Sequence, residues 1–201
     1  MRNVTIGNQV WMVENLNVEF FQNGDAIPEA QTEEEWYRAF ENNEPAWCYY
    51  DNNPMNGDKY GKLYNWFAVI DNRGLCPAGW HIPTKVDWDF LMEFLGGENI
   101  AGGKLKSVSG WDDEKHSDVS TNESGFTALP GGCRSPSISG LVFSGLERIG
   151  YWWSATKGYH SLAFYPFLTH NFIGPVGNDG RVFYMNDGGE NCGFSVRCVR
   201  D

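Results

Sequence analysis

The chain has 201 residues, enough to bury the core of one large domain or of two small ones. Its 26 acidic and 15 basic residues give a net charge of -11. An acidic surface repels phosphate groups, so we expect neither nucleic acid nor an anionic membrane surface as a partner. No run of about 18 apolar residues occurs, which excludes a transmembrane helix.

The first residues predict a short β-hairpin. Apolar and polar residues alternate from Val4 to Met12, on both sides of a Gly7-Asn8 turn. The same stretch lacks the charged start and the apolar run of a signal peptide. We therefore expect either a cytoplasmic protein or a piece of a longer, exported one.

A helix is predicted to begin after Thr32. Thr32 and Glu35 form a capping box, and the acidic residues of the first turn suit the positive end of a helix dipole. Trp36, Tyr37 and Phe40 supply the apolar stripe, and the sequence NNEP ends the helix. A strand is expected next, in the aromatic sequence AWCYY, and a second apolar run, KLYNWFAVI, follows a polar loop.

The sequence GWHIPTKVDW, residues 79–88, marks the step from a strand into a second helix. Pro83 keeps its predecessor out of helical angles, and Thr84 with Asp87 forms the capping box. His81 lies at this junction, so we interpret it as part of the scaffold and not as a catalytic group. Gly96-Gly97 ends the helix. The predicted buried stripe consists of Val86, Phe90, Leu91, Phe94 and Leu95.

From Gly102 onward the pattern indicates turns and short strands. Two candidate strands are SLAFYPFL (161–168) and GRVFYMN (180–186), and GFSVRCVRD closes the chain with strand-like alternation. The 24 glycines and the aromatic content of 15% also favour a loop-rich fold that contains β-strands. No repeat or linker divides the sequence. We therefore expect one domain, residues 1–201, of the α+β class.

Five cysteines leave at least one thiol without an intrachain partner. No CxxC pair occurs, which argues against a zinc ribbon or a thioredoxin-like site. One or two disulfides in a secreted protein are the favoured interpretation, and the spacing does not choose the pairs. The five are Cys48, Cys76, Cys133, Cys192 and Cys198.

Seven motifs, in order from about Val4 to Asp201, resemble the Fibrobacter succinogenes major paralogous domain. They are TIGNQVWMVENLNV, YGKLYNWFAV, CPAGWHIPTKVDW, AGGKLKS, TNESGFTALPGG, GYWWSAT and GFSVRCVRD. That domain is abundant in secreted and lipid-anchored surface proteins of Bacteroidetes and Fibrobacteres. The family in turn is similar to the C-type-lectin-like fold, in the branch of the formylglycine-generating enzymes.

The resemblance implies a fold whose termini pair in one sheet, with two helices flanking small antiparallel sheets and long loops forming a binding face. Related domains serve as adhesins, pilus-tip modules and phage receptor-binding proteins. In several of them a diversity-generating retroelement rewrites codons of the C-terminal face. This sequence departs from the family pattern at Pro166, where a basic residue is usual, and in a longer segment from Thr169 to Cys192.

The resemblance also suggests an oxidase activity, because some proteins of this fold are oxidases, but this sequence lacks their residue patterns. Formylglycine-generating enzymes use a closely spaced cysteine pair that binds copper, whereas Cys192 and Cys198 are six residues apart. Related iron-dependent enzymes need a His-x-x-x-His-x-Glu cluster, and the four histidines of this chain are scattered. We therefore expect no catalytic residues and no enzyme activity.

Calcium is the metal that the resemblance brings into question. Sugar-binding relatives use Glu-Pro-Asn or Gln-Pro-Asp together with Trp-Asn-Asp, and this sequence has no full match to them. No metal ligand is assigned and no cofactor is expected, with a structural calcium kept as a minor alternative. Its oxygen ligands would come from the loop that contains Asp112, Asp113, Asp118, Asn122 and Glu123.

The segment 159–191 interleaves aromatic residues with Asn, Asp and Gly, a composition typical of adaptable recognition surfaces. Alternate residues of the segment are expected in the core, with Trp152 and Trp153 packed beneath the face. The predicted ligand-binding residues are Tyr159, His160, Tyr165, Phe167, His170, Asn171, Phe172, Asn178, Asp179, Arg181, Phe183, Asn186 and Asp187.

These features together predict a non-catalytic adhesin or receptor-binding module. We expect it to be extracellular, on a bacterial cell surface or a phage, with the signal or anchor outside this sequence. The expected partner is a cell-surface glycan or a surface protein of the host or of a bacterium. Two alternatives stay open: a structural domain of a larger surface lipoprotein or assembly, and a divergent oxidase of the formylglycine-generating type.

Overall fold

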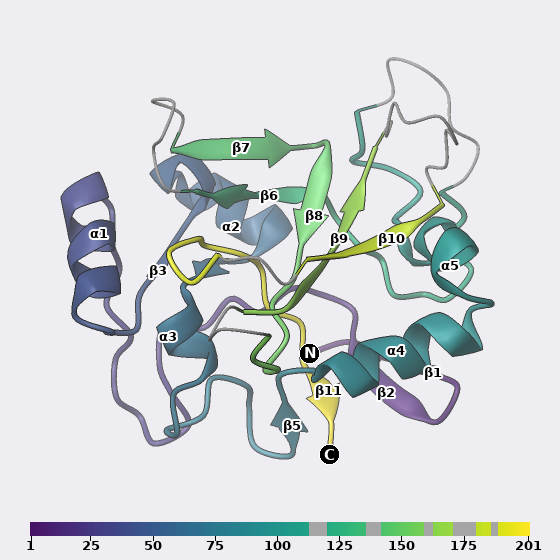
Figure 1. Cartoon of the computed structure of the whole chain (residues 1–201), viewed down its shortest axis with the longest axis horizontal. Coiled ribbons are helices and arrows are strands. Elements are labelled where there is room, and N and C mark those ends of the chain that lie inside the picture. Colours follow the sequence, from purple (N-terminus) through teal and green to yellow (C-terminus); the bar gives the residue numbers. More distant parts are fainter. Residues whose placement is uncertain (113–119, 136–141, 159–162, 171–179, 186–188) are drawn as a thin grey trace.

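The computed structural model of the chain describes residues 1–112, 120–135, 142–158, 163–170, 180–185 and 189–201. Within these residues lie three small sheets and five α-helices, so the α+β prediction is confirmed and the expectation of two helices is wrong (Figure 1). The helices are α1 (Glu33–Glu41), α2 (Pro54–Tyr60), α3 (Trp66–Val69), α4 (Lys85–Phe94) and α5 (Glu98–Leu105), with a 3-10 turn η1 (Tyr50–Asn52). The strands are β1 (Asn3–Ile6), β2 (Gln9–Met12), β3 (Trp47–Cys48), β4 (Leu63–Tyr64), β5 (Trp80–His81), β6 (Gly131–Arg134), β7 (Phe143–Leu146), β8 (Ile149–Tyr151), β9 (Tyr165–Thr169), β10 (Val182–Met185) and β11 (Val199–Arg200).

The first sheet brings the two ends of the chain together. Its strand order is β1-β2-β11-β5, so the N-terminal hairpin neighbours the C-terminal strand, as expected. The predicted hairpin is confirmed, and its turn contains Gly7 at a φ of 62°, a conformation that glycine adopts without steric cost. Val199 of β11 pairs with Trp11 on one side and with His81 on the other.

The second sheet has the order β10-β9-β8-β6-β7 and carries both candidate strands of the C-terminal half. β9 and β10 pair antiparallel, with Phe167 opposite Phe183. One pairing departs from the expected antiparallel arrangement, since β6 runs parallel to β8 at Gly132 and Gly150. The third sheet is the antiparallel pair β3-β4.

Both predicted capping boxes are present. The hydroxyl of Thr32 accepts a hydrogen bond from the Glu35 N–H at 3.1 Å, and the hydroxyl of Thr84 accepts one from the Asp87 N–H at 3.3 Å. In the stripe of α1 one residue was assigned wrongly, because the Tyr37 side chain is exposed. Local cap chemistry therefore located the helix starts, while the buried face depended on tertiary packing.

The buried face of α4 also differs from the predicted stripe. Leu91 and Leu95 are buried as expected, but Val86, Phe90 and Phe94 are exposed. Their place in the core is taken by Trp88, whose ring lies 4.9 Å from that of Trp11 in β2, and by Met92. The helix is apolar on more than one side, so helical spacing alone did not choose the inner face.

Helix α5 replaces a segment that we expected to be turn and strand from Gly102 onward. Gly102 is buried in the helix, where an added Cβ would lie 2.7 Å from the carbonyl oxygen of Gly180. The missing side chain thus lets α5 approach the start of β10 closely, and this packing contact outweighs the low helix propensity of glycine.

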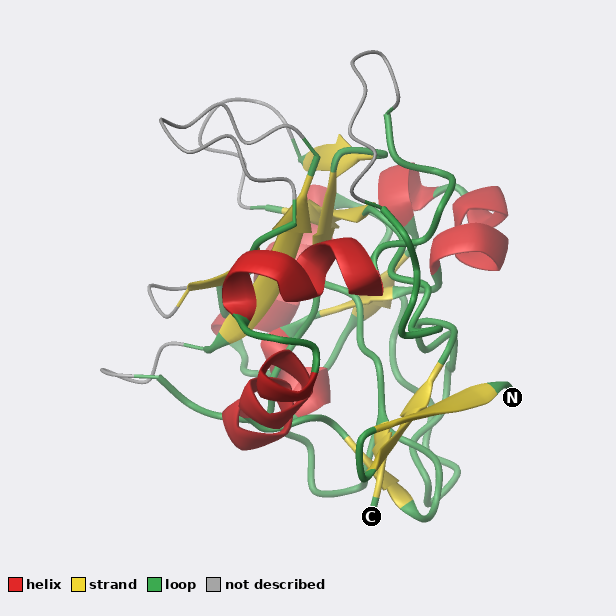
Figure 2. Cartoon of the chain, turned by 90° about the vertical axis from the view of Figure 1, so that its right-hand side faces the viewer, coloured by secondary structure: helices red, strands yellow, loops and turns green. Residues whose placement is uncertain are grey.

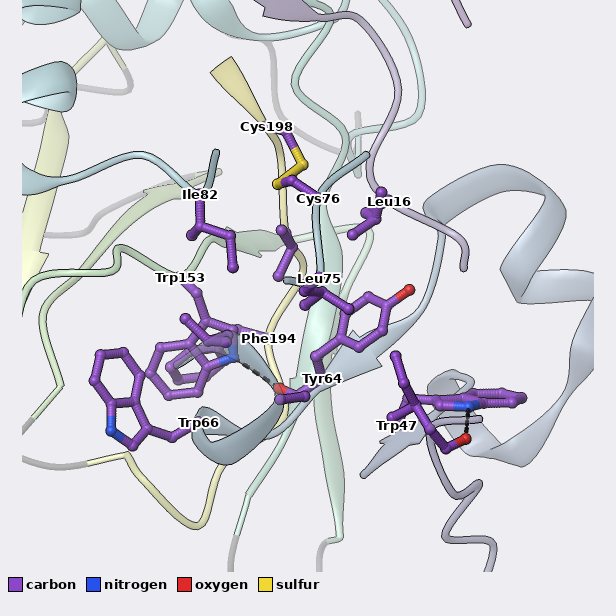
Figure 3. Close-up of a cluster of buried hydrophobic side chains, with 14 of the residues drawn as sticks. Leu16, Trp47, Tyr64, Trp66, Leu75, Cys76, Ile82, Trp153, Phe194 and Cys198 are labelled. Atoms are coloured by element: carbon purple, nitrogen blue, oxygen red, sulfur yellow. Dashed lines mark hydrogen bonds between the residues drawn. A yellow bond between two sulfur atoms is a disulfide. The ribbon is translucent and has the colours of Figure 1, made fainter. Parts of the chain in front are cut away.

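The largest hydrophobic cluster surrounds a disulfide between Cys76 and Cys198 (Figure 3). Beside it, the indole N–H of Trp153 donates a hydrogen bond to the backbone oxygen of Tyr64 at 2.7 Å. The ring of Phe194 lies 4.5 Å from that of Trp153. The disulfide joins residues 122 positions apart and links the segment before β5 to the segment before β11.

Candidate functional site

One face of the second sheet carries a row of aromatic side chains from neighbouring strands. Phe183 of β10 pairs with Phe167 of β9, which pairs with Tyr151 of β8, so all three point to the same side. The rings of Phe167 and Phe183 are stacked at 5.1 Å, and those of Tyr151 and Phe167 lie 5.5 Å apart. Tyr151 also stacks on Phe194 at 5.0 Å. We call Phe183, Phe167, Tyr151 and Phe194 the aromatic ladder.

The aromatic ladder leads from the core to the edge of the sheet. Phe194 is buried, whereas the other three rings are half-buried. Tyr165, on the same face, packs its ring 4.7 Å from that of Phe194. Burial raises the pKa of Tyr151 above its ordinary value, so its hydroxyl stays neutral in the physiological range. The surface is therefore aromatic and uncharged at its centre.

A positive charge stands at the outer end of the aromatic ladder. The guanidinium of Arg181 lies 5.3 Å from the centroid of the Phe183 ring, a cation–π contact. Two polar atoms at this end of strands β9 and β10, Arg181 Nε and His170 Nε2, are buried and have no hydrogen-bond partner among the residues that the structure describes. Folded proteins leave few such atoms unpaired, so this end has unused hydrogen-bonding capacity.

The opposite face of the sheet is packed against the helices. Leu168 and Val182 are buried there, and Trp152 fills the space beneath β8. Phe164 and Tyr184 stack at 5.1 Å on the same side. Trp152 and Trp153 are both buried, as predicted. The sheet thus has one side in the core, while the other side carries the aromatic ladder.

Five of the predicted ligand-binding residues fall in the described part of the chain. Tyr165, Phe167 and Phe183 come together on one face with Arg181 beside them, whereas His170 follows the end of β9. The prediction that these residues are exposed is only partly right, because all five are half-buried. The other predicted residues lie outside the described residues: Tyr159, His160, Asn171, Phe172, Asn178, Asp179, Asn186 and Asp187.

Sequence reasoning missed the centre of the aromatic ladder. Tyr151 lies in the sequence GYWWSAT, where alternation places it on the side opposite Trp152. That signal was available, but the sequence does not show that β8 lies beside β9. Phe194 was assigned to the closing strand and not to a site, although it forms the inner end of the ladder.

The cysteines do not form the reactive pair considered for an oxidase. Cys198 is bound to Cys76, so Cys192 and Cys198 are not two free thiols. Cys48, Cys133 and Cys192 are free. Burial raises the pKa of Cys48 to about 11 and that of Cys192 to about 12, so these thiols are protonated and weakly nucleophilic at neutral pH.

His81 lies within hydrogen-bonding reach of two carboxylates, one in α4 and one at the last residue of the chain. Its Nδ1 lies 2.7 Å from Oδ1 of Asp201, and its Nε2 lies 3.4 Å from Oδ2 of Asp87, the acidic residue of the α4 capping box. Within the described ranges, no group of three or more His, Cys, Asp and Glu residues is placed to hold a metal. Asp113 and Asp118 of the acidic loop lie outside those ranges. No helix among the described residues is long and apolar enough to span a membrane.

Comparison with known protein families matches the chain to a family. The model of a family described as the Fibrobacter succinogenes major domain (Fib_succ_major) matches residues 4–200. No curated protein and no solved structure matches the chain significantly. The matched range begins and ends where the sequence motifs predicted, and it spans nearly the whole chain.

Proposed function

The chain belongs to the Fibrobacter succinogenes major domain family. From this premise we propose that it is a non-catalytic binding module with a C-type-lectin-like fold. The aromatic ladder carries the proposal, because large rings held on a rigid sheet bind a partner at low cost in conformational entropy. Arg181, beside the outermost ring, adds a charged hydrogen-bond donor, a residue type that is common at binding hot spots.

We place the module outside the bacterial cytoplasm, on a cell surface or a phage, as a domain of a larger surface protein. The Cys76–Cys198 disulfide supports this location, since structural disulfides form and persist in oxidising compartments. The low reactivity of the free thiols supports binding over oxidase chemistry. At pH 7 a thiol with a pKa of about 12 supplies almost no thiolate.

We propose a surface protein, and not a glycan, as the partner. Sugars pack their C–H groups on the faces of aromatic rings, where the π electrons are concentrated. In the ladder these faces are occupied by neighbouring rings, at 5.1 Å between Phe183 and Phe167 and 5.0 Å between Tyr151 and Phe194. The half-buried rings therefore offer their edges, which suit apolar side chains and carbonyl oxygens of a protein surface.

The test is binding of the purified domain to arrays of surface proteins and glycans, with calcium and with a chelator. The variant Phe167→Ala/Phe183→Ala removes two ladder rings. Phe20→Ala/Tyr37→Ala is its matched control, because both side chains are exposed and belong to other parts of the fold. Thermal unfolding measured by circular dichroism confirms that each variant is folded.

We expect specific binding to a protein, reduced at least tenfold by the ladder variant and unchanged in the control. Truncation of a central aromatic residue of an interface commonly costs more than about 1 kcal/mol. Binding to glycans alone would contradict the choice of partner. Loss of binding in the chelator would restore the calcium alternative. If the folded domain binds nothing on either array, the result would favour a structural domain of a larger surface protein.

A further inference from the structure

Helix α4 presents an apolar stripe to solvent, on the side away from its buried face. Val86, Phe90 and Phe94 follow one another at intervals of four residues, so they lie on one side of the helix. They keep 62%, 53% and 64% of their surface exposed. Figure 2, viewed from the side on which α4 and α5 lie in Figure 1, shows these helices in front of the rest of the chain. Adjacent exposed apolar residues of this size mark interaction surfaces in soluble proteins.

The stripe runs into a hollow between α4 and the β1–β2 turn. The hollow has a volume of about 440 Å³ and is lined by Ile6, Gly7, Asn8, Gln9, Phe90, Glu93 and Phe94. Gly7 sets its shape, because a Cβ at this position would lie 3.0 Å from the ring of Phe94. The turn glycine thus lets the hairpin reach the helix and close one side of the hollow. A large apolar side chain of a partner fits such a site.

The charges around the stripe are acidic. Glu93 is the charged residue among those that line the hollow, and Asp89 lies one turn before it. The ammonium of Lys85, the basic residue of α4, is bound to the Asp89 carboxylate at 2.6 Å. With a net charge of -11, two copies of this chain repel each other, which disfavours a second copy as the occupant. A basic partner is attracted by the same charges.

We propose that the exposed face of α4 binds a basic amphipathic helix of another protein. An apolar anchor of that helix enters the hollow beside Phe90 and Phe94, a second anchor packs on Val86, and Lys or Arg side chains pair with Glu93. The stripe runs over the nine residues from Val86 to Phe94, eight steps that rise about 12 Å at 1.5 Å per residue, which matches two or three anchors at i, i+4 spacing. This surface belongs to elements other than the aromatic ladder, so it stands independently of the ligand proposed there.

The experiment measures fluorescence anisotropy with three labelled 14-residue peptides. The first is an amphipathic helix of Leu and Lys, the second has the same composition in scrambled order, and the third is an amphipathic helix of Leu and Glu. The variants are Phe90→Ser/Phe94→Ser and Glu93→Lys, with Tyr37→Ser on α1 as the matched control. Because the Glu93 side chain is exposed, Glu93→Lys tests the surface even if the double variant folds poorly.

We expect the Leu/Lys helix to bind at least tenfold more tightly than the other two peptides. Phe90→Ser/Phe94→Ser and Glu93→Lys should each weaken this binding at least tenfold, and Tyr37→Ser should leave it unchanged. Equal binding of the scrambled peptide, or equal binding by the wild type and the double variant, would overturn the proposal. So would sedimentation data in which the wild type dimerises and the double variant does not, because a second copy would then be the occupant.

Discussion

Asn15 holds the buried guanidinium of Arg197, and replacing it with leucine tests how much that polar network stabilises the fold. The Asn15 side-chain oxygen accepts hydrogen bonds from Arg197 Nη2 at 2.6 Å, from Arg197 Nε at 3.1 Å and from the Trp152 indole at 2.9 Å. Its amide donates to the backbone oxygen of Tyr60 at 2.8 Å. Burial lowers the pKa of Arg197 to about 9, so the group still carries its charge at neutral pH.

The expected loss of stability depends on the polar groups that Asn15→Leu deprives of a hydrogen-bond acceptor. Leucine is close to asparagine in size, so the change creates little cavity, but it removes the acceptor of three hydrogen bonds. Arg197 keeps one described acceptor, the backbone oxygen of Phe126. Stranding a buried charge costs about 3–5 kcal/mol, and an unpaired indole N–H adds to it. We expect a loss of about 4 kcal/mol in the free energy of unfolding, a large share of the total stability of a typical domain.

The assay is urea unfolding followed by tryptophan fluorescence, with the single variant Arg197→Met and the double variant Asn15→Leu/Arg197→Met as the comparisons. Removing both partners leaves no stranded charge, so the double variant should be more stable than Asn15→Leu alone by at least about 1 kcal/mol. A single variant within about 1 kcal/mol of the wild type would refute the reasoning. So would a double variant whose loss equals the sum of the two single losses.

Three further predictions concern the disulfide, one glycine of strand β6 and one helix cap. Cys76→Ser/Cys198→Ser removes a bond between residues 122 positions apart and should cost about 5 kcal/mol of stability through chain entropy, measured by thermal unfolding without reductant. A melting temperature close to that of the wild type would contradict this prediction. Gly132 has a φ of 65°, and a Cβ there would lie 2.6 Å from a backbone oxygen. Gly132→Ala should therefore lower the free energy of unfolding, measured in urea, by more than about 2 kcal/mol. A smaller loss would show that the strand can shift. Burial raises the pKa of Asp87, but hydrogen bonds at the cap outweigh it and lower the pKa below its usual value of about 3.9. The carboxylate therefore stabilises the fold above about pH 4 and loses this effect as the pH falls through the lowered pKa, so the stability gap between wild type and Asp87→Asn should be constant at neutral pH and close in acid; a gap independent of pH would contradict it.

Local chemistry made the element starts predictable. The turn at Gly7, and the capping boxes that begin at Thr32 and Thr84, each depend on residues within a few positions of one another. Contacts between residues so close in the sequence can be predicted from the sequence alone. The same holds for the alternation that located β9 and β10.

Long-range choices could not be predicted in the same way. Val86 and Leu91 both fit helical spacing, and the buried side of α4 depends on packing against residues far away in the sequence, such as Trp11 of β2. Gly102 favours a turn when judged by its helix propensity, but in the structure its missing side chain lets α5 approach Gly180, just before β10. For the site, alternation gave Phe167 and Phe183, but Tyr151 joined them only through the order of strands in the sheet.

The disulfide has a mechanical consequence. A pull on the two ends of this sequence is carried by Cys198 directly to Cys76, so the 121 residues between them cannot be drawn out while the bond is intact. Only residues 1–75 and 199–201 can be pulled straight, to an extended length of about 270 Å at roughly 3.5 Å per residue. The reduced chain can reach an extended length of about 700 Å. In the surface protein proposed above, the disulfide would limit how far the chain extends when it is pulled between a cell and its target. The sheet that carries the aromatic ladder lies inside the closed loop, so the pull would not draw it out.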